Sequence, residues 1–463
     1  LFSSIASLTC DEHISKGSHR PHVPQDIRAF NLASFEMVDY VIIDQNKTPI
    51  QNLELLKPDY FAKGYEYVKE NVNSKTQAEL DIIESYGGEM LFTPGDIIYS
   101  SSSLQDISLP KLHLEKLINI MHNENITFND LNETLKSFKN KNVHIVGDTI
   151  VDDFTNCSVI GGMTKTPTMS LRIENSKRYI GGAAIVAKHL KGAGANVNFT
   201  TILGDDAAGK DVIEDLHKSD IGLKYFLDKS RPTTIKNAVI AGGYRLIKLD
   251  TVDNRIIDQA IVEKFKNTLR DCKSEILMFS DFRHGIFNKA TIDTFLKVIS
   301  KDKFKVGDSQ VASRWGNVLD FKGFDLITPN EREVRFALAD QDTIIKPLSD
   351  QILKLSNAKC LILKCGERGL ICNTPEDNSW KQVNNFYSLD TFAENVVDPV
   401  GAGDALMAYA TLSLYSTKSP VIASILGSIA AALECELDGN IPISVKMVSE
   451  RINKIEKLCN LER

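Results

Sequence analysis

The sequence predicts an α/β protein with a doubly wound, mainly parallel sheet, and three observations support this prediction. From residue 142 almost to the C-terminus, strand-like apolar segments alternate with helix-like segments, which is the pattern of βαβ units with helices on both faces of a sheet. A glycine-rich turn at 401–403 stands directly before an apolar helical run at 405–415. The length of 463 residues suits two or three domains.

The first hundred residues predict a smaller α/β domain, residues 1–105. Its pattern is short strand-like segments separated by amphipathic ones. The strands are expected at 1–9, 38–44 and 88–93, with 38–44 buried, and the helices at 25–36 and 74–88.

Residues 106–140 are polar and mostly helix-forming, which predicts a helical linker between two domains. The same stretch could instead pack as a helix between two copies of the chain. Residues 141–463 then form the second domain. Within it, 153–179 and the segment after Arg231 predict additional β-strands that form a small lid.

Composition and charge limit the kinds of molecule that the protein is expected to bind. The net charge of −7 argues against a general nucleic-acid or anionic-membrane surface. The eight cysteines are scattered without C-x-x-C or zinc-site spacing, which is typical of reduced thiols. There is no apolar run long enough to span a bilayer and no signal peptide pattern. We therefore expect a cytoplasmic protein, a homodimer, that binds small molecules.

The turn Gly401-Ala402-Gly403-Asp404 is the strongest candidate for chemistry. Unpaired N–H groups at a helix N-terminus favour an anion, and glycine allows its close approach. A carboxylate in the first helical turn can accept a proton from a substrate hydroxyl. On this stretch alone, an ordinary aspartate after a glycine turn remains an equal alternative.

The segment 398–404, DPVGAGD, resembles the D-T-x-G-A-G-D signature of the PfkB/ribokinase family of carbohydrate kinases, with Pro399 in place of threonine. The di-glycine at 181–182, the strand start VGDTIVDD at 146–153 and LKCGERG at 363–369 resemble other segments of the same family, in the same order. The resemblance implies a ribokinase-like fold and ATP-dependent phosphorylation. It implies that Asp404 is the catalytic base and that 401–403 form an anion hole.

The resemblance also implies roles for other residues. Asn330 and Glu333 match an N-x-x-E pattern that organises Mg²⁺ through water, although Glu333 by itself could be a surface carboxylate. The sugar-side candidates are Asp148, Asp152, Gly181, Gly182, Lys236, Arg245 and Asp281. The ATP-side candidates are Asn330, Lys364, Gly366 and Gly369.

Within the family, segments such as RPTTIK at 231–236 and SDFRHGI at 280–286 most resemble the heptose-7-phosphate kinase branch. This implies phosphorylation of D-glycero-D-manno-heptose 7-phosphate at its anomeric hydroxyl. Lys236, Arg245 and Lys248 could hold the phosphate already on that sugar, or they could be solvated basic residues of a hairpin. A different sugar or a nucleoside is the alternative substrate.

The first domain resembles cytidylyltransferase-like nucleotidyltransferases. The implied phosphate-binding residues are Lys16, Lys63, Gly64, Ser100, Ser101, Ser102 and Ser103. The H-x-G-H motif of that family is missing, because the stretch from His19 to His22 has its spacing but not its glycine. We expect an upstream segment that carries it. The combination resembles bifunctional enzymes of ADP-heptose synthesis with the domain order reversed. The alternative is a non-catalytic scaffold.

Overall fold

The computed structural model describes residues 3–14, 23–64, 74–93, 112–162, 169–310, 317–376 and 385–461. The chain divides into two compact units, Leu1–Pro110 and Lys111–Arg463. Among the described residues, every helix is too short or too polar to cross a bilayer.

The first unit is a partial α/β domain, as the sequence predicts. Its described residues form two two-stranded parallel sheets, β1 (Ile5–Thr9) with β2 (Tyr40–Asp44), and β3 (Tyr60–Gly64) with β4 (Glu89–Thr93). The helices are α1 (Gln25–Ala33), α2 (Ile50–Leu56) and α3 (Ser74–Ser85).

The prediction that 38–44 is a buried strand is wrong. In β2 only Asp44 is buried, while Tyr40 is 62% exposed. The reason is that β2 pairs with β1 alone among the described strands, so little apolar surface covers it. Helix α2 and strand β3 add elements between those that the pattern indicated.

The second unit is built on a nine-stranded sheet in the order β17-β16-β15-β14-β13-β12-β5-β8-β9. The seven strands from β15 to β9 are parallel, and β16 and β17 add an antiparallel edge. Their bounds are β5 (Asn142–Gly147), β8 (Asn196–Leu203), β9 (Gly222–Leu227), β12 (Ile276–Asp281), β13 (Phe304–Ser309), β14 (Leu326–Ile327), β15 (Leu361–Lys364), β16 (Leu370–Asn373) and β17 (Phe386–Leu389).

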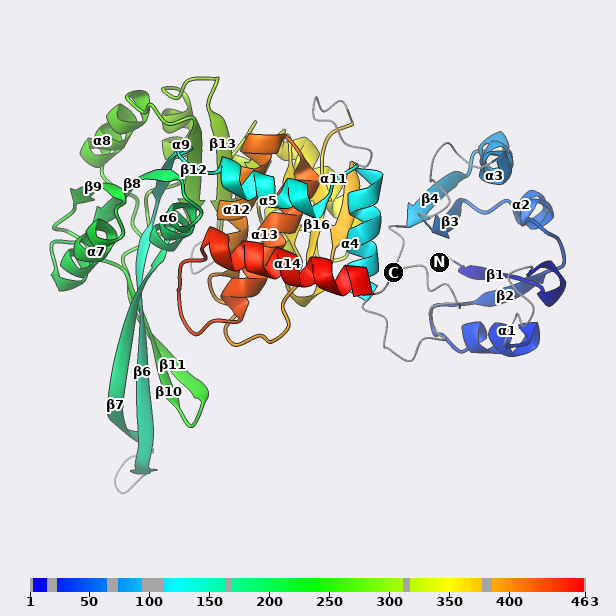
Figure 1. Cartoon of the computed structure of the whole chain (residues 1–463), viewed down its shortest axis with the longest axis horizontal. Coiled ribbons are helices and arrows are strands. Elements are labelled where there is room, and N and C mark those ends of the chain that lie inside the picture. Colours follow the sequence, from blue (N-terminus) through cyan, green and yellow to red (C-terminus); the bar gives the residue numbers. More distant parts are fainter. Residues whose placement is uncertain are drawn as a thin grey trace. The chain divides into compact units, whose positions relative to one another are not determined.

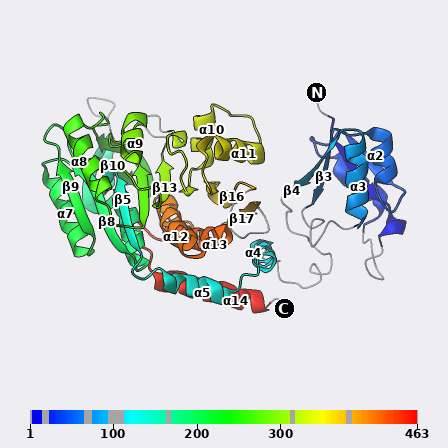
Figure 2. The same ribbon diagram turned by 90° about the horizontal axis from the view of Figure 1, so that it is seen from above.

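Helices cover both faces of this sheet, so the doubly wound prediction is confirmed (Figure 2). Successive residues of β12 enter opposite cores, with Met278 on one side and Phe279 on the other. One core is closed by α6 (Ala183–Gly192), α7 (Ala207–Lys218), α12 (Ala402–Thr417), α13 (Pro420–Cys435) and α14 (Val445–Leu461). The other is closed by α8 (Gln259–Arg270), α9 (Lys289–Leu296), α10 (Glu331–Leu338) and α11 (Ile345–Ser356).

The stretch expected to be a linker lies largely within the second unit. Helices α4 (Leu112–Asn123) and α5 (Phe128–Ser137) contribute Leu117 and Leu131, both fully buried, to the first of those cores. Phe138, which follows α5, packs edge-on against Tyr409 of α12 at 6.1 Å between ring centroids. Apolar burial of this kind makes both helices part of the domain rather than a connector.

The predicted lid is a separate four-stranded sheet in the order β11-β10-β6-β7. It projects away from the main sheet (Figure 1). Its strands are β6 (Thr149–Gly162), β7 (Met169–Gly182), β10 (Ile235–Ala241) and β11 (Tyr244–Thr251). Gly182 joins β7 to α6 with φ of 63°, and a Cβ there would lie 2.5 Å from the Asp148 carbonyl oxygen.

Candidate active site

The turn at 401–403 begins α12, as predicted. Gly401 is its N-cap with φ of 93°, and a Cβ at this position would lie 2.9 Å from Oε1 of Glu434. A side chain there would be both strained and obstructed, so the close turn requires glycine. The Asp404 N–H already donates to the Gly401 carbonyl oxygen at 2.8 Å. The amides that precede it, at the very start of the helix, lack carbonyl partners in a preceding turn and favour an anion beside Gly401, Ala402 and Gly403.

Asp404 lies in that first turn, where two cavities meet. The larger cavity, about 610 Å³, is lined by residues that include Asn330, Glu333, Lys364, Gly366, Leu406 and Ser428. The smaller, about 180 Å³, is lined by residues that include Asp152, Gly182, Lys236, Arg245, Lys248 and Asn440. Asp404 and Gly401 line both cavities. A carboxylate placed there can face ligands in both cavities.

The environment of Asp404 disfavours its charged form. Burial first and the nearby Asp308 second raise the pKa of Asp404, and Lys364 acts to lower it, with a net value of about 8. The group therefore holds its proton at neutral pH in the ligand-free protein. Additional positive charge in the larger cavity would favour ionisation, which a proton acceptor needs.

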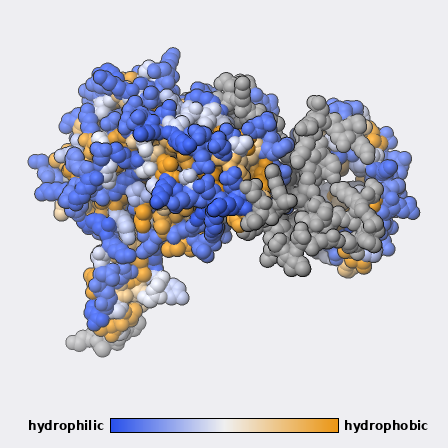
Figure 3. Space-filling view, viewed as in Figure 1, coloured by the Kyte–Doolittle hydropathy of each residue, from blue (hydrophilic) through white to orange (hydrophobic). Residues whose placement is uncertain are grey.

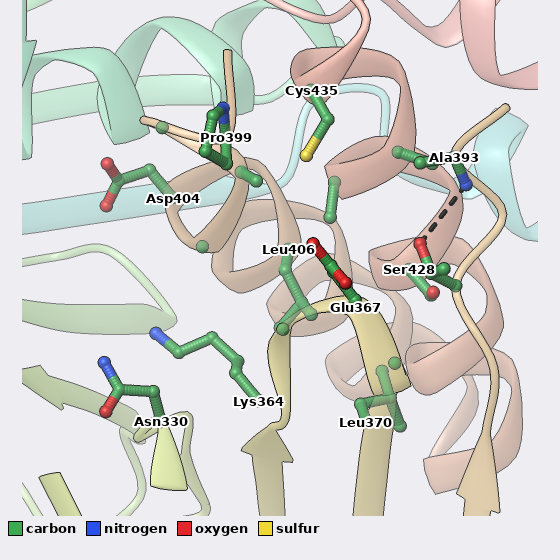
Figure 4. Close-up of a pocket in the computed structure, with 18 of the residues that line it drawn as sticks. Asn330, Lys364, Glu367, Leu370, Ala393, Pro399, Asp404, Leu406, Ser428 and Cys435 are labelled. Atoms are coloured by element: carbon green, nitrogen blue, oxygen red, sulfur yellow. Dashed lines mark hydrogen bonds between the residues drawn. The ribbon is translucent and has the colours of Figure 1, made fainter. Parts of the chain in front are cut away.

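Lys364 and Arg332 both line this cavity, and the Lys364 ammonium pairs with Asp308. Its Nζ lies 3.2 Å from both carboxylate oxygens of Asp308, and its side chain is 17% exposed. Burial acts to lower the pKa of Lys364, but Asp308, Glu333 and Asp404 outweigh burial and raise it. Figure 4 shows the Lys364 side chain extending towards Asn330, on the side of the cavity where Asp404 lies.

Sequence reasoning missed Asp308. It lies at the C-terminal end of β13, and the carboxyl ends of parallel strands are where such sheets bind ligands. The polar GDS at 307–309 after an apolar strand was the available signal.

Asn330 and Glu333 form a capping box at the start of α10. The Asn330 backbone N–H and side-chain amide both donate to the Glu333 carboxylate, at 2.7 and 2.8 Å, and the Glu333 N–H donates to Asn330 Oδ1 at 2.8 Å. The N-x-x-E spacing thus has a structural explanation as well. Both residues also line the larger cavity.

The donor set of this cavity fits Mg²⁺. Carboxylate oxygens of Asp308 and Glu333 and the amide oxygen of Asn330 are hard ligands. Within the described parts of the chain, no three metal-ligating side chains form a closed cage. An open arrangement of this kind suits Mg²⁺, which is held by one or two carboxylates together with phosphates and waters.

Asp152, which the sequence analysis names as a sugar-ligand candidate, lies on β6 and lines the smaller cavity. The Asn440 side-chain amide donates to Asp152 Oδ2 at 2.9 Å. Gly181 leaves room for this carboxylate, since a Cβ there would lie 2.1 Å from Oδ2. Burial raises the pKa of Asp152, and Lys236 acts in the opposite direction. Nothing in the sequence indicated the role of Asn440, because Asn440 is 288 residues away from Asp152 along the chain.

Three basic residues of the lid line the same cavity: Lys236, Arg245 and Lys248. Arg245 donates to Asp398 at 2.9 Å and lies over the Phe154 ring at 5.6 Å. Arg245 therefore connects β11 to the segment that leads into the turn at 401–403, which we call the anion turn. Lys236 and Lys248 remain as cations that can face a bound anion.

A comparison with known protein families identifies the family of the second unit. Residues 140–445, roughly two thirds of the chain, match the pfkB family of carbohydrate kinases. The chain belongs to the pfkB family of carbohydrate kinases.

Relatives of this kinase include bifunctional proteins. It is 23% identical over 321 residues to the bifunctional protein HldE of Sulfurimonas denitrificans, which covers 68% of this chain and 65% of that protein. It is 26% identical over 305 residues to HldE of Campylobacter jejuni subsp. doylei, which covers 65% and 62% respectively. The chain thus spans less than two thirds of the length of these relatives.

Solved structures show the same fold. Phosphofructokinase-2 from Escherichia coli, in its tetrameric inhibited form, has a TM-score of 0.55 at 16% identity over 68% of this chain and 99% of that one. Ribokinase from Arabidopsis thaliana, complexed with ribose and ATP, has a TM-score of 0.52 at 17% identity with the same coverage.

Two predicted sugar ligands, Asp148 and Asp281, are absent from the described residues that line the larger and the smaller cavity. Asp148 is 2% exposed and accepts from the backbone N–H groups of Phe282 and His284, at 3.0 and 3.2 Å. Asp281 is 1% exposed and accepts from Arg283 and Ser309, at 2.8 Å each. Both hold the loop after β12 in place, a role that the sequence alone could not separate from ligand binding.

The two glycines after β15 both line the larger cavity but differ in how closely other atoms approach them. Gly366, with φ of 63°, lines the larger cavity. Gly369, with φ of 81°, also lines it and packs against backbone, because a Cβ there would lie 2.1 Å from the Leu389 carbonyl oxygen.

Of the candidates in the first unit, the structure describes Lys63 and Gly64. The Lys63 ammonium pairs with the buried carboxylate of Glu79 and donates to Thr76 Oγ1 at 3.4 Å. Gly64 pairs with Thr93 at the end of β3. Lys16, Ser100, Ser101, Ser102, Ser103 and the stretch from His19 to His22 lie outside the described residues.

Glu434 is a buried carboxyl behind the anion turn that sequence reasoning also missed. It is 1% exposed, and burial raises its pKa to about 8, with Asp404 adding to the effect. The folded kinase therefore holds a proton that the unfolded chain releases near its ordinary pKa. Stability linked to this group is present at low pH and is lost progressively as pH rises towards 8.

We expect Glu434→Gln to stabilise the ligand-free kinase at pH 8–9, since the amide has the shape of the protonated acid. The gain in Tm should be a few degrees, on the order of 1–2 kcal/mol. It should shrink as pH falls towards 5. Thermal melts of both proteins across this range measure it, and a gain that is constant with pH would contradict the assignment.

Proposed function

We propose that this kinase transfers the γ-phosphoryl group of ATP to a hydroxyl of a sugar phosphate, with Asp404 as the general base. The observation that carries the proposal is the position of Asp404, which lines both the larger and the smaller cavity beside Gly401. In-line transfer needs donor and acceptor on opposite sides of one reacting centre.

The larger cavity suits ATP. Its lining includes the small side chains of Ala431, Ala432 and Cys435 of α13, against which a base can pack. Figure 4 shows Cys435 at this wall. The phosphates would then extend towards the turn at 401–403. The amides there would hold the transferred group as charge builds on it. Asn330, Glu333 and Asp308 would hold Mg²⁺, which supplies charge neutralisation on the phosphates.

The smaller cavity suits the acceptor. Asp152, fixed by Asn440, would accept hydrogen bonds from sugar hydroxyls. The acceptor hydroxyl would then lie beside Asp404. Lys236 and Lys248, on the lid, would hold a phosphate that the sugar already carries. This arrangement supports D-glycero-D-manno-heptose 7-phosphate, phosphorylated at the anomeric hydroxyl, as the substrate.

We expect Lys236→Met to raise KM for the sugar phosphate about tenfold, because one charge-assisted hydrogen bond is lost. KM for ATP should remain within twofold. Lys177→Met is the matched control, since Lys177 is an exposed lid lysine paired with Asp438. A sugar phosphate whose KM does not respond to Lys236→Met would contradict the assigned phosphate position.

The direct test is mass spectrometry of the products from ATP, Mg²⁺ and a panel of acceptors. The panel contains the heptose 7-phosphate, hexose phosphates, unphosphorylated sugars and nucleosides. A product only from unphosphorylated sugars or nucleosides would replace the sugar-phosphate proposal with the alternative substrate class. The absence of any ATP-dependent product would overturn the kinase proposal.

We propose further that the first unit belongs to a nucleotidyltransferase that acts on the resulting sugar 1-phosphate, as in ADP-heptose synthesis. Its partial α/β fold supports this. The ion pair of Lys63 with Glu79 favours the alternative of a non-catalytic scaffold, because that lysine is already neutralised. Formation of a nucleotide sugar and pyrophosphate by the full chain distinguishes the two.

We propose that two copies of the kinase associate through the lid. Figure 3 shows hydrophobic residues on this projecting sheet. Val159, Ile160 and Ile173 are 58%, 63% and 68% exposed. Sedimentation analysis of the full chain measures the oligomeric state directly.

A further inference from the structure

The half-buried ammonium of Lys364 shares the larger cavity with the carboxylates of Asp308, Glu333 and Asp404. Lys364 Nζ is 3.2 Å from both carboxylate oxygens of Asp308. The Asp308 side chain is only 6% exposed. In the ligand-free protein, Lys364 is therefore the partner that keeps Asp308 from being a buried, unpaired charge.

The same ammonium lies directly beside the anion turn. A Cβ added to Gly403 would lie 3.2 Å from Lys364 Nζ. A phosphoryl group held by the amides of this turn would therefore come within reach of Nζ. Lysine has a long, flexible side chain with three rotatable donors, so its ammonium can turn from one oxygen ligand to another without movement of β15.

Asp308 then has two prospective partners. With Lys364 turned to phosphate, its carboxylate is free to hold the divalent cation that accompanies the nucleotide. With no nucleotide present, the ammonium and a divalent cation exclude each other, because both need the same two oxygens.

Resting on the function proposed above, we propose that Lys364 is a cation shared between Asp308 and the transferred phosphoryl group. In the ligand-free protein it competes with divalent metal for Asp308, and bound nucleotide relieves this competition. Metal and nucleotide binding are then coupled through one side chain, and the coupling is reciprocal.

Lys364→Met tests this by removing the ammonium from a site that keeps its carboxylates. We expect the nucleotide-free variant to bind Mn²⁺ about tenfold more tightly than wild type, measured by electron paramagnetic resonance of free Mn²⁺. We expect ATP without metal, in EDTA, to bind the variant about tenfold more weakly, measured by calorimetry. Both readouts are independent of catalysis.

Two further variants act as controls. Lys359→Met removes another lysine–aspartate pair, with Asp325 at 2.7 Å, just before the start of the same strand. It should change neither affinity. Lys364→Arg keeps the positive charge and should bind Mn²⁺ within threefold of wild type.

If Lys364→Met fails to fold, Asp308→Asn gives the reciprocal result. It should weaken Mn²⁺ binding and strengthen metal-free ATP binding, because the ammonium is released from its carboxylate. Unchanged or weaker Mn²⁺ binding by Lys364→Met would overturn the proposal, as would opposite changes in Asp308→Asn. If the variants show these changes in binding while the wild-type protein phosphorylates no sugar phosphate, the proposed function fails and the proposal for Lys364 stands.

Discussion

Asp404→Asn should lower kcat by a factor of about 10² to 10⁴, the range for loss of a positioned general base. The amide has the shape of the carboxyl group but cannot take a proton from the acceptor hydroxyl. The affinities for ATP and sugar should stay within a few-fold of wild type, because the anion turn and Asp152 are unchanged. Steady-state kinetics measures the loss, with a saturating concentration of an acceptor that the wild-type protein phosphorylates.

The pH profile separates a base from a residue that merely shapes the turn. A base must be ionised, so activity is present above its pKa and is lost as pH falls through it. Since the pKa of Asp404 is raised to about 8 in the ligand-free protein, kcat/KM of wild type should rise from pH 6 towards 8. Added positive charge in the cavity would move this rise to lower pH.

The residual activity of Asp404→Asn should lack this rise. Asp438→Asn, which neutralises a surface carboxylate that is 70% exposed, serves as the control and should retain wild-type kcat and pH dependence. Near-normal turnover by Asp404→Asn would remove Asp404 from the role of base.

Gly181→Ala should raise KM for the sugar by about 10²-fold while leaving ATP affinity within twofold. The added Cβ would lie 2.1 Å from Asp152 Oδ2 and 2.7 Å from Asn440 Nδ2. Both groups must move, and the hydrogen bond that orients Asp152 would break. A displacement of about 1 Å at a ligand-orienting group can cost on the order of 10²-fold in rate.

Gly161→Ala is the control for backbone strain in the lid, because Gly161 has φ of 138°, which disfavours a side chain, while no atom lies within 4 Å of the methyl group that it adds to β6. It should bind the sugar as wild type does. If both alanine variants lose sugar affinity equally, a general change in the lid explains the loss and the role of Gly181 fails. Calorimetric titration with the sugar phosphate and with ATP measures the two affinities separately.

The fold and the anion turn were predictable because their signals are local. Alternation of strands and helices indicated the doubly wound sheet, and the positions 401–404 lie within one helical turn, where spacing alone brings an acid beside free amides. The same holds for Asn330 and Glu333, whose spacing of three produces a capping box wherever a helix begins.

Burial and orientation were not predictable in this way. Asp148 and Asp152 stand four residues apart at the start of the same domain, yet one is held by backbone amides and the other faces a cavity. The difference depends on β12 and its following loop, more than a hundred residues away. The assignment of α4 and α5 to the second unit likewise depended on apolar contacts with α12 and α14.

Short sequence motifs predicted the family, which the family comparison confirms, and the glycine turn that begins α12, since each depends on neighbours within a few residues. The same motifs are the source of the proposal that Asp404 is the base. Glu434 and Asn440 became visible only once the chain was folded, because each acts on a partner from a distant segment. The polar end of its strand marked Asp308, but only the folded chain showed its effect on Asp404. The physical reason is that charge and desolvation act through space: the pKa of Asp404 and the pairing of Lys364 are set by which carboxylates the sheet brings together.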